Sequence, residues 1–448
     1  MKSEDLVRLE LENYNVNLED SDELIDSNKN HTIYLKLNKE HNPCCPYCNS
    51  HLVKTRGYKT VTLKYSTTHE DNIKIVLKRQ VYICESCHHY FKQANPFEQD
   101  KSQITLQKDM KILEALKDIN STYTSVAKRF GVSPTYVIKL FDQRINVTRK
   151  KLTEVLSFDK VYNKNLSKKY CFVIYSPQMN KILDILDSRK LYYTEKYFRK
   201  IPLNERNSVK YISINLNAFY RILAKKCFKK SLIYADSFHV IKNLNSYFNE
   251  LRIDVMKKYE HLKSNKDNYY WLYKKFWKLL LANPGDFDMS MIIVSRSKMR
   301  MTRKQIVDYM LSIDTKLKEA YELKEKYKEF NKTATINSAC ERLNELINKF
   351  LNFDHITYHK CARLLISWHD EIVNSFNRVN NYRISNGKIE RANKDIGTIF
   401  DLSFGSHNFT RLRNKIMFAY NKTEPISYNK NKAVYVRPGK KRGKYKRQ

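Results

Sequence analysis

Four cysteines near the N-terminus have the spacing of a metal site. They form two Cys-x-x-Cys pairs, Cys45 with Cys48 and Cys84 with Cys87. Each pair bends the chain so that two thiolates reach one ion, and two pairs complete the tetrahedral four-sulfur shell that Zn²⁺ prefers. The sequence therefore predicts a structural zinc site, with two disulfides of a secreted protein as the alternative. Cys44 lies one residue outside this spacing, so we do not include it.

Two acidic residues further along the chain each close a short apolar run. We expect Asp159 at the end of a strand that begins near residue 154, and Asp236 at the end of a strand that begins at residue 232. Carboxylates at strand ends can hold two Mg²⁺ ions about 4 Å apart, which align a water or a 3′-hydroxyl with a scissile phosphate. The alternative for each aspartate is a helix cap or a turn residue.

The hydrophobic pattern around these aspartates predicts an α/β domain. Strands are expected over residues 154–160, 170–175, 181–186, 209–215 and 232–236, with a helix over residues 193–199 and another between the last two strands. Three strands, a helix, and two more strands separated by a helix is the element order of an RNase H-like core. Such a sheet would present Asp159 and Asp236 at its centre.

A helix-turn-helix is predicted upstream of this domain. Helices are expected over residues 104–116, 123–130 and 134–141, with a turn from Gly131 to Ser133. Gly131 can adopt the left-handed turn conformation, and Ser133 can cap a helix that has Pro134 in its first turn. An ordinary helical hairpin is the alternative. The residues expected at DNA are Thr135, Tyr136 and Lys139 in the major groove, and Lys128 and Arg129 near phosphates.

The composition favours a polyanionic partner. The chain has 83 Lys and Arg against 47 Asp and Glu, a formal net charge of +36, which indicates nucleic acid, with a membrane surface as the weaker alternative. The N-terminus lacks the order of a signal peptide, and no apolar run approaches about 18 residues. We therefore expect a cytoplasmic protein.

Several segments resemble the ISL3 family of bacterial insertion-sequence transposases. They are VLSFDK, KILDILDSRK, KYISINLNAFY, SLIYADSFHVIKNLN and RISNGKIERANKDIGTIFDLSFGSHNFTRLRNKI. The resemblance runs from near Cys45 to about Tyr420, in the family's order of zinc ribbon, helix-turn-helix and RNase H-like domain split by a long helical insertion. It implies DDE-type chemistry, in which hydrolysis dependent on Mg²⁺ or Mn²⁺ frees a transposon 3′ end that then attacks target DNA.

The resemblance also assigns catalytic residues. Asp159 matches the family's first catalytic Asp, and Glu390 matches its final Glu. The second catalytic Asp aligns with Asn215, which offers a neutral oxygen in place of a full charge. Asp236, in the segment Asp-Ser-Phe-His, either supplies the missing charge or only pins the sheet to the next helix. Asp159, Asp236 and Glu390 are thus the expected Mg²⁺ ligands, with Asn215 as a fourth site residue.

The chain is therefore expected to be a multidomain α+β protein. The expected parts are a zinc-ribbon module (1–100), a helix-turn-helix (101–150), the first part of an RNase H-like core (151–236), an all-helical insertion (237–380), the last part of the core (381–420) and a basic tail (421–448). Trp271 and Trp277 in the insertion are expected in its core, with stacking on a flipped base as the alternative.

Three functions remain open at this point. The first is a transposase that binds terminal inverted repeats and cleaves and joins DNA, acting as a homodimer or larger synaptic complex at the bacterial nucleoid. The second is a catalytically weakened or domesticated relative that only binds DNA. The third is a transcriptional regulator, which would use only the first 150 residues. Double-stranded DNA is the partner in each, and no membrane is involved.

Overall fold

The computed structural model describes residues 10–14, 16–18, 24–25, 31–68, 71–97, 103–163, 168–262, 269–294, 299–379, 381–403 and 408–426. The chain divides into two compact units. The first unit comprises Met1–Thr148 and Asp395–Gln448, and the second comprises Arg149–Lys394. Most of the expected basic tail, from residue 427 onward, lies outside the described residues. Among the described helices, none is both long enough and apolar enough to cross a membrane.

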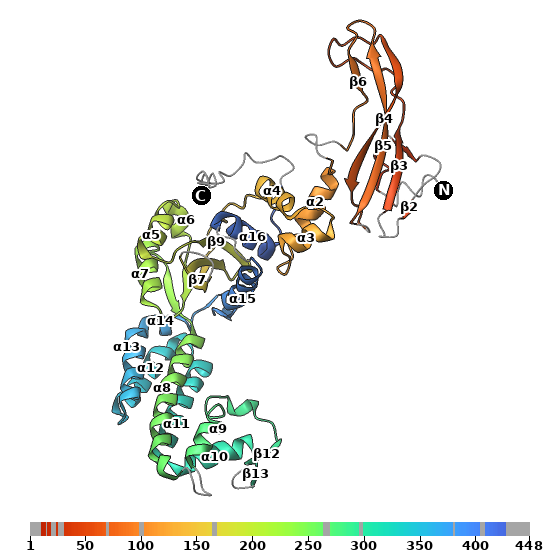
Figure 1. The fold of residues 1–448 in the computed structure, drawn as a ribbon. Coiled ribbons are helices and arrows are strands. Elements are labelled where there is room, and N and C mark those ends of the chain that lie inside the picture. The colour runs from red at the N-terminus through yellow and green to blue at the C-terminus, as the bar shows by residue number, and fades with distance from the viewer. Residues whose placement is uncertain are drawn as a thin grey trace, which may run out of the picture. The chain divides into compact units, whose positions relative to one another are not determined.

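The N-terminal part of the first unit is a sheet with the order β1-β3-β5-β4 (Figure 1). Its central strand β5 pairs parallel with β3 and antiparallel with β4. Alternate residues of β3 and β5, such as Ile33, Leu35, Ile75 and Leu77, are buried in one core, which is the period-two pattern of a strand with one face covered. The strands are β1 (Val16–Leu18), β2 (Leu24–Ile25), β3 (His31–Leu37), β4 (Val53–Tyr65), β5 (Ile73–Cys84) and β6 (Tyr90–Lys92).

Three short helices follow this sheet: α2 (Leu106–Ala115), α3 (Tyr123–Arg129) and α4 (Pro134–Arg144). The turn between α3 and α4 has the predicted chemistry, because Gly131 has a φ of 61° and the Ser133 side chain accepts a hydrogen bond from the backbone of Tyr136. Ala127 is buried where α3 and α4 pack together. These backbone features agree with the helix-turn-helix pattern read from the sequence.

The C-terminal helix α16 (Phe409–Asn421) belongs to the same unit. The guanidinium of Arg411 pairs with the carboxylate of Asp142 in α4, and the rings of Phe141 and Phe418 meet edge to face at 5.9 Å. The ammonium of Lys415, which is 3% exposed, donates to the carbonyl of Leu116. The first unit is therefore built from both ends of the chain.

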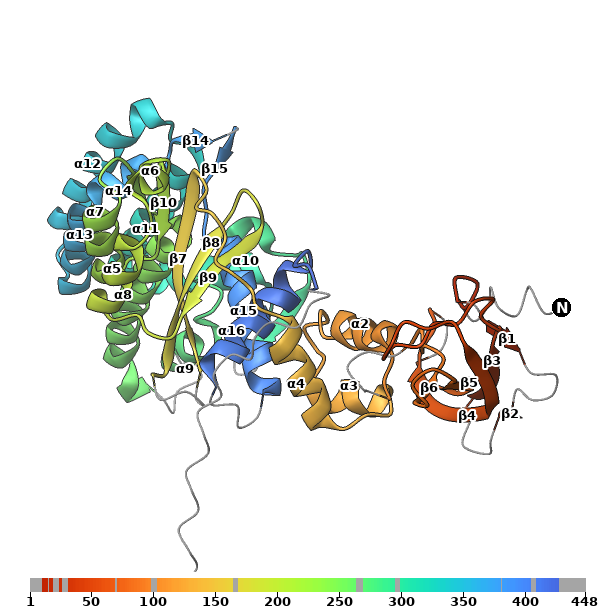
Figure 2. The same cartoon turned by 90° about the horizontal axis from the view of Figure 1, so that it is seen from above.

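The second unit is organised around a mixed five-stranded sheet with the order β11-β10-β7-β8-β9. Strands β7, β8 and β9 are antiparallel neighbours, whereas β10 and β11 run parallel to β7. Helices α5 (Leu191–Arg199), α6 (Leu203–Asn207) and α7 (Ala218–Cys227) lie on one side of the sheet (Figure 2). The strands are β7 (Val155–Tyr162), β8 (Tyr170–Ser176), β9 (Lys181–Leu186), β10 (Tyr211–Ile214) and β11 (Leu232–Ala235).

The first strand of this sheet extends beyond its predicted end, so the placement of Asp159 at a strand terminus is wrong. Pairing of β7 with β10 stops at Phe158, but pairing with β8 continues from Ser157 to Tyr162. Asp159 is therefore no longer paired with β10 but is still paired with β8. Asp236 lies directly after β11, as predicted.

A long helix, α8 (Ser237–Lys258), leads from the sheet into a mainly helical segment (Figure 1). The expectation that this segment is all-helical is wrong, because β12 (Met291–Val294) and β13 (Met299–Thr302) form an antiparallel hairpin and β14 (Arg378–Val379) pairs with β15 (Tyr382–Arg383). The remaining elements are η1 (Glu260–Leu262), α9 (Tyr269–Phe276), η2 (Pro284–Asp286), α10 (Arg303–Ile313), α11 (Thr315–Thr333), α12 (Ile336–Asn352), α13 (Ile356–Ser367), α14 (His369–Asn374) and α15 (Gly387–Leu402).

Candidate functional site

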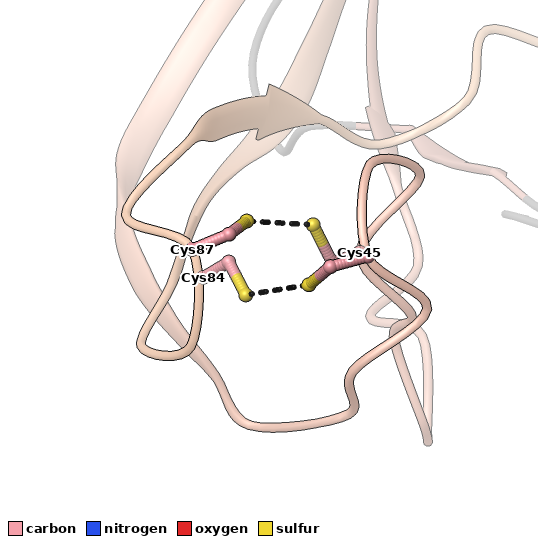
Figure 3. Close-up of side chains that lie close together, drawn as sticks. Cys45, Cys84 and Cys87 are labelled. Carbon is pink, nitrogen blue, oxygen red and sulfur yellow. Dashed lines mark hydrogen bonds between the residues drawn. The ribbon is translucent and has the colours of Figure 1, made fainter.

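The four predicted zinc ligands come together at one end of the N-terminal sheet. The sulfurs of Cys45 and Cys87 are 3.6 Å apart and those of Cys48 and Cys84 are 3.5 Å apart (Figure 3). All four sulfurs lie within 4.8 Å of one another, and the cysteines are free thiols. Zn–S bonds of about 2.3 Å in a tetrahedron separate the sulfurs by similar distances. The donor set and its spacing fit a Zn²⁺ ion.

The two Cys-x-x-Cys turns have the same backbone geometry. The residue after the second cysteine of each pair, Asn49 or His88, has a positive φ of 56° or 57°. Its amide donates back to the carbonyl of the first cysteine, at 2.9 Å in both turns. Desolvation opposes ionisation of Cys84, but backbone hydrogen bonds around residues 86 and 87 and the neighbouring thiols lower its pKa to about 6.

The expected DNA-contacting residues differ in their exposure and in the contacts that they already make within the protein. Thr135, Lys139 and Lys128 are exposed. Tyr136 is less exposed than a residue expected in the major groove, and its hydroxyl donates to Asp109 at 2.5 Å. Its ring is partly covered because α2, which provides Asp109, packs against α4. Arg129 is exposed but already forms an ion pair with Asp71, at 2.6 Å.

In the second unit, three predicted site residues lie side by side on parallel strands. Strand register pairs Phe158 with Ile214 and Ile214 with Ala235. The next residues on the three strands are Asp159, Asn215 and Asp236, which places them in a row across the carboxyl edge of β7, β10 and β11. Glu390, in the first turn of α15, lies beside this row.

Asp159 is surrounded by amide donors. Its two carboxylate oxygens accept hydrogen bonds from Asn215 Nδ2 at 2.8 Å and from Asn393 Nδ2 at 2.7 Å. Asn386 Nδ2 in turn donates to Asn215 Oδ1 at 2.8 Å. Burial raises the pKa of Asp159 to about 6, against the lowering effect of the Lys160 backbone amide. The oxygen of Asn215 is thus engaged by an amide, and its nitrogen faces a carboxylate.

A second group of ligand atoms forms at the N-terminus of α8. The Nδ1 atom of His239 lies 2.9 Å from Asp236 Oδ2 and 3.7 Å from Glu390 Oε1. One ligand atom from each of these three residues lies within 4.8 Å of the other two. Two carboxylates and an imidazole at this spacing fit a divalent cation.

Asp236 also makes the contacts expected of a residue that joins sheet and helix. Its Oδ2 atom accepts from the backbone of His239 and caps α8, and its Oδ1 atom accepts from the backbone of Asn386 at 3.0 Å. It is only 2% exposed. Both interpretations offered by the sequence therefore have contacts that support them.

Three residues at this site were given no catalytic or metal-binding role from the sequence. Asn386 belongs to the Ser-Asn-Gly segment before Glu390, and Asn393 follows Glu390 by three residues, which is one helical turn. His239 stands three residues after Asp236, on the first turn of the same helix. The helical spacing could have indicated Asn393 and His239, whereas nothing local distinguishes Asn386.

Comparison with known families identifies one match. Residues 156–416 match the sequence pattern of the ISL3 group, described as transposase, and this range includes Asp159, Asn215, Asp236 and Glu390. No curated protein matches the chain in a sequence search. Because the match spans more than half of the 448 residues, the chain belongs to the ISL3 family of transposases.

Proposed function

We propose that the protein is a DDE-type transposase that binds the terminal inverted repeats of an insertion sequence and cleaves and transfers their strands. The observation that carries this proposal is the row of Asp159, Asn215 and Asp236 across three parallel strands, with Glu390 beside it. The strand order β11-β10-β7-β8-β9 supports an RNase H-like core. On this view α8 to α14 form the insertion that splits that core.

Asp159, Asp236 and Glu390 would hold the catalytic Mg²⁺ or Mn²⁺, with His239 available as a further ligand. When bound, such an ion activates a water or 3′-hydroxyl and neutralises charge on the phosphate. The chain's own residues orient this site: Asn386 holds Asn215 and Asp236, and Asn393 holds Asp159. These amides keep three side chains in place without adding charge.

DNA recognition is proposed for the first unit. The exposed Thr135 and Lys139 of α4 would enter the major groove, and Lys128 would contact phosphate. The cysteine quartet would bind a structural Zn²⁺ ion. With a net charge of +36, affinity should fall steeply as salt rises, through counterion release. A homodimer or larger complex would bring two transposon ends together.

A second function is favoured by one observation. Asn215 directs its amide group at Asp159, and Asn386 occupies the Asn215 oxygen. This neutral network satisfies Asp159 in the absence of an ion, as expected of a weakened transposase that keeps DNA binding and has lost most cleavage. The asparagine thus separates the two candidates.

The experiment is a cleavage assay on duplexes that carry the element's own terminal repeats, with Mg²⁺ or Mn²⁺. Wild type, Asp159→Ala and Asn215→Asp are compared, with Asp187→Ala as the control for an aspartate that is half-exposed beside Lys168. We expect cleavage by wild type, its loss in Asp159→Ala and an increase in Asn215→Asp. Equal cleavage by wild type and Asp159→Ala would refute the site. Cleavage by Asn215→Asp alone would establish the second function.

A further inference from the structure

A surface pocket opens along α8 next to the candidate metal group. Its volume is about 450 Å³, and its lining includes Phe238, Lys242, Asn245, Asn249 and Trp277. Four of these residues recur every three to four positions on α8, so they share one face of that helix. The first of them, Phe238, precedes His239, which lies within hydrogen-bonding distance of Asp236.

The aromatic residues of this pocket are turned away from the protein core. Phe238 is 56% exposed. Trp277 is half-buried, although its neighbours Phe276 and Leu280 are packed in the core. Trp271, by contrast, packs against that core and meets Phe276 edge to face. The two tryptophans that the sequence treated alike therefore have different surroundings.

The polar groups of the pocket can recognise the edge of a base. The Asn245 side-chain oxygen is buried and has no hydrogen-bond partner within the part of the chain that the structure describes. A buried acceptor without a partner is costly, and because the Asn245 side chain lines the pocket, a turn of its amide would let this oxygen accept from a base amine. Lys242 is exposed at the rim, and its ammonium favours an anionic ligand such as a phosphate.

We propose that this pocket binds an unpaired nucleobase of the DNA strand next to the scissile phosphate. The inference rests on the proposed function, because that function places the phosphate at Asp236, His239 and Glu390. From His239 to Asn245 the helix axis advances about 9 Å, so a nucleotide neighbouring that phosphate reaches the pocket. Phe238 and Trp277 would stack on the base, Asn245 would accept from its edge, and Lys242 would meet its phosphate.

The test is photocrosslinking of the full-length protein to a single-stranded oligothymidylate that carries one 5-iodouracil, followed by mass spectrometry. We expect attachment at Phe238 or Trp277. Because base stacking on one aromatic side chain changes affinity severalfold, Phe238→Ala should lower labelling of Trp277 about fivefold or more. Tyr192→Ala, which removes a 68% exposed aromatic ring on α5, is the matched control and should leave labelling unchanged.

Two further arms define what would overturn the inference. A fully paired duplex of the same length should label the pocket much less than the single strand; equal labelling would refute the requirement for an unpaired base. Labelling that avoids Phe238 and Trp277, or that survives Phe238→Ala unchanged, would refute the pocket itself. The assay runs without added Mg²⁺ or Mn²⁺, so labelling does not depend on cleavage. If the pocket is labelled but the protein cuts no DNA in the cleavage assay above, the proposed enzyme activity is refuted and the pocket is not.

Discussion

The amide at Asn215 determines how the site is stabilised when no ion is bound. Asp159 is 6% exposed, and a second carboxylate at hydrogen-bonding distance would repel it in a region with little water. Asn215 instead donates a hydrogen bond to Asp159, at 2.8 Å. The natural residue therefore favours the metal-free site, at the expense of charge for holding cations.

Asn215→Asp should make stability depend on metal. Without added Mg²⁺ or Mn²⁺, thermal unfolding should shift down by about 2 °C or more, since loss of the hydrogen bond and the added repulsion together exceed about 1 kcal/mol. Addition of Mn²⁺ should raise the unfolding temperature of the variant more than that of wild type. The control is Asn204→Asp, an exposed asparagine of α6. Equal responses of the variant and wild type would show that position 215 does not face the ion.

His239 should affect which cation binds. Imidazole is a better ligand for Mn²⁺ than for Mg²⁺, which prefers oxygen. We expect His239→Ala to weaken Mn²⁺ binding about tenfold and to change Mg²⁺ binding much less. Electron spin echo spectroscopy of bound Mn²⁺ should show a nitrogen coupling in wild type that is absent in the variant. His261→Ala, an exposed histidine in η1, should keep the coupling; its loss there would contradict the assignment.

The zinc ligands can be separated from a neighbouring cysteine that differs by a single position. Cys44 is exposed, whereas Cys45 is buried with its sulfur 3.6 Å from that of Cys87. We expect wild type and Cys44→Ser to bind one Zn²⁺ ion per chain and Cys45→Ser to lose it, because three thiolates leave the tetrahedral shell open. Zinc is quantified by mass spectrometry after gel filtration. Equal zinc contents in the two variants would refute the four-cysteine site.

Among the helices and strands, the sequence pattern predicted the features that depend only on residues adjacent in the chain. The turn at Gly131 and the cap at Ser133 depend on neighbours in the chain, and both are present. The end of β7 depends on two partner strands that stop at different residues, so the sequence misplaced Asp159 within it. The four-residue run of β12 fits a strand or part of a helix, and only its pairing with β13 decides.

The sequence directs attention to Asp159, Asn215 and Asp236, which the structure brings together, but not to the two further amides. Asp159 and Asp236 follow apolar runs that mark strands, which a sequence displays. Asn386 and Asn393 act through contacts that span 171 and 234 residues of chain. The helical spacing from Glu390 points to Asn393, but asparagine is common in turns and caps, so nothing local distinguishes Asn386 before the fold is known.

Packing of α16 against the segment between α2 and α3 should depend on pH through Lys415. Burial lowers the pKa of this lysine to about 7, and its ammonium donates to Leu116, to Asp118 at 3.3 Å and to Ser121 at 2.9 Å. The unfolded lysine keeps the higher ordinary pKa, so between the two values the unfolded chain binds more protons. Stability should therefore rise as pH increases from about 7 toward 10.

Lys415→Met should remove this rise. The free energy of unfolding of the variant minus that of wild type should therefore be larger at pH 6.5 than at pH 9.5, by an amount on the order of a few kcal/mol. Calorimetry is the suitable measurement, because Trp271, Trp277 and Trp368 all lie in the second unit and fluorescence would miss the first. Lys59→Met, an exposed lysine in β4, is the control. A difference between variant and wild type that stays constant with pH would contradict the buried charge.

For the whole molecule, the main feature is that the second unit is formed by one continuous segment, whereas the first is formed by two segments. The first unit closes only when α16, more than 260 residues after α4, packs against it. The second unit, Arg149–Lys394, is inserted between these two pieces. The proposed DNA-reading helices are thus stabilised by a segment far downstream in the chain, so their packing is complete only after α16 has been synthesised.

A chain cut between the units should stay together through α16. With a protease site inserted between Thr148 and Arg149, we expect the two fragments to co-elute after cleavage, because Phe418 is fully buried and Arg411 pairs with Asp142. Replacing both residues by alanine removes about 3 kcal/mol or more from this contact and should release the N-terminal fragment on gel filtration. Thr410→Ala, at an exposed position of α16, should not. If the double variant co-elutes as wild type does, α16 is not what completes the first unit, and its two pieces would have to be regarded as separate domains.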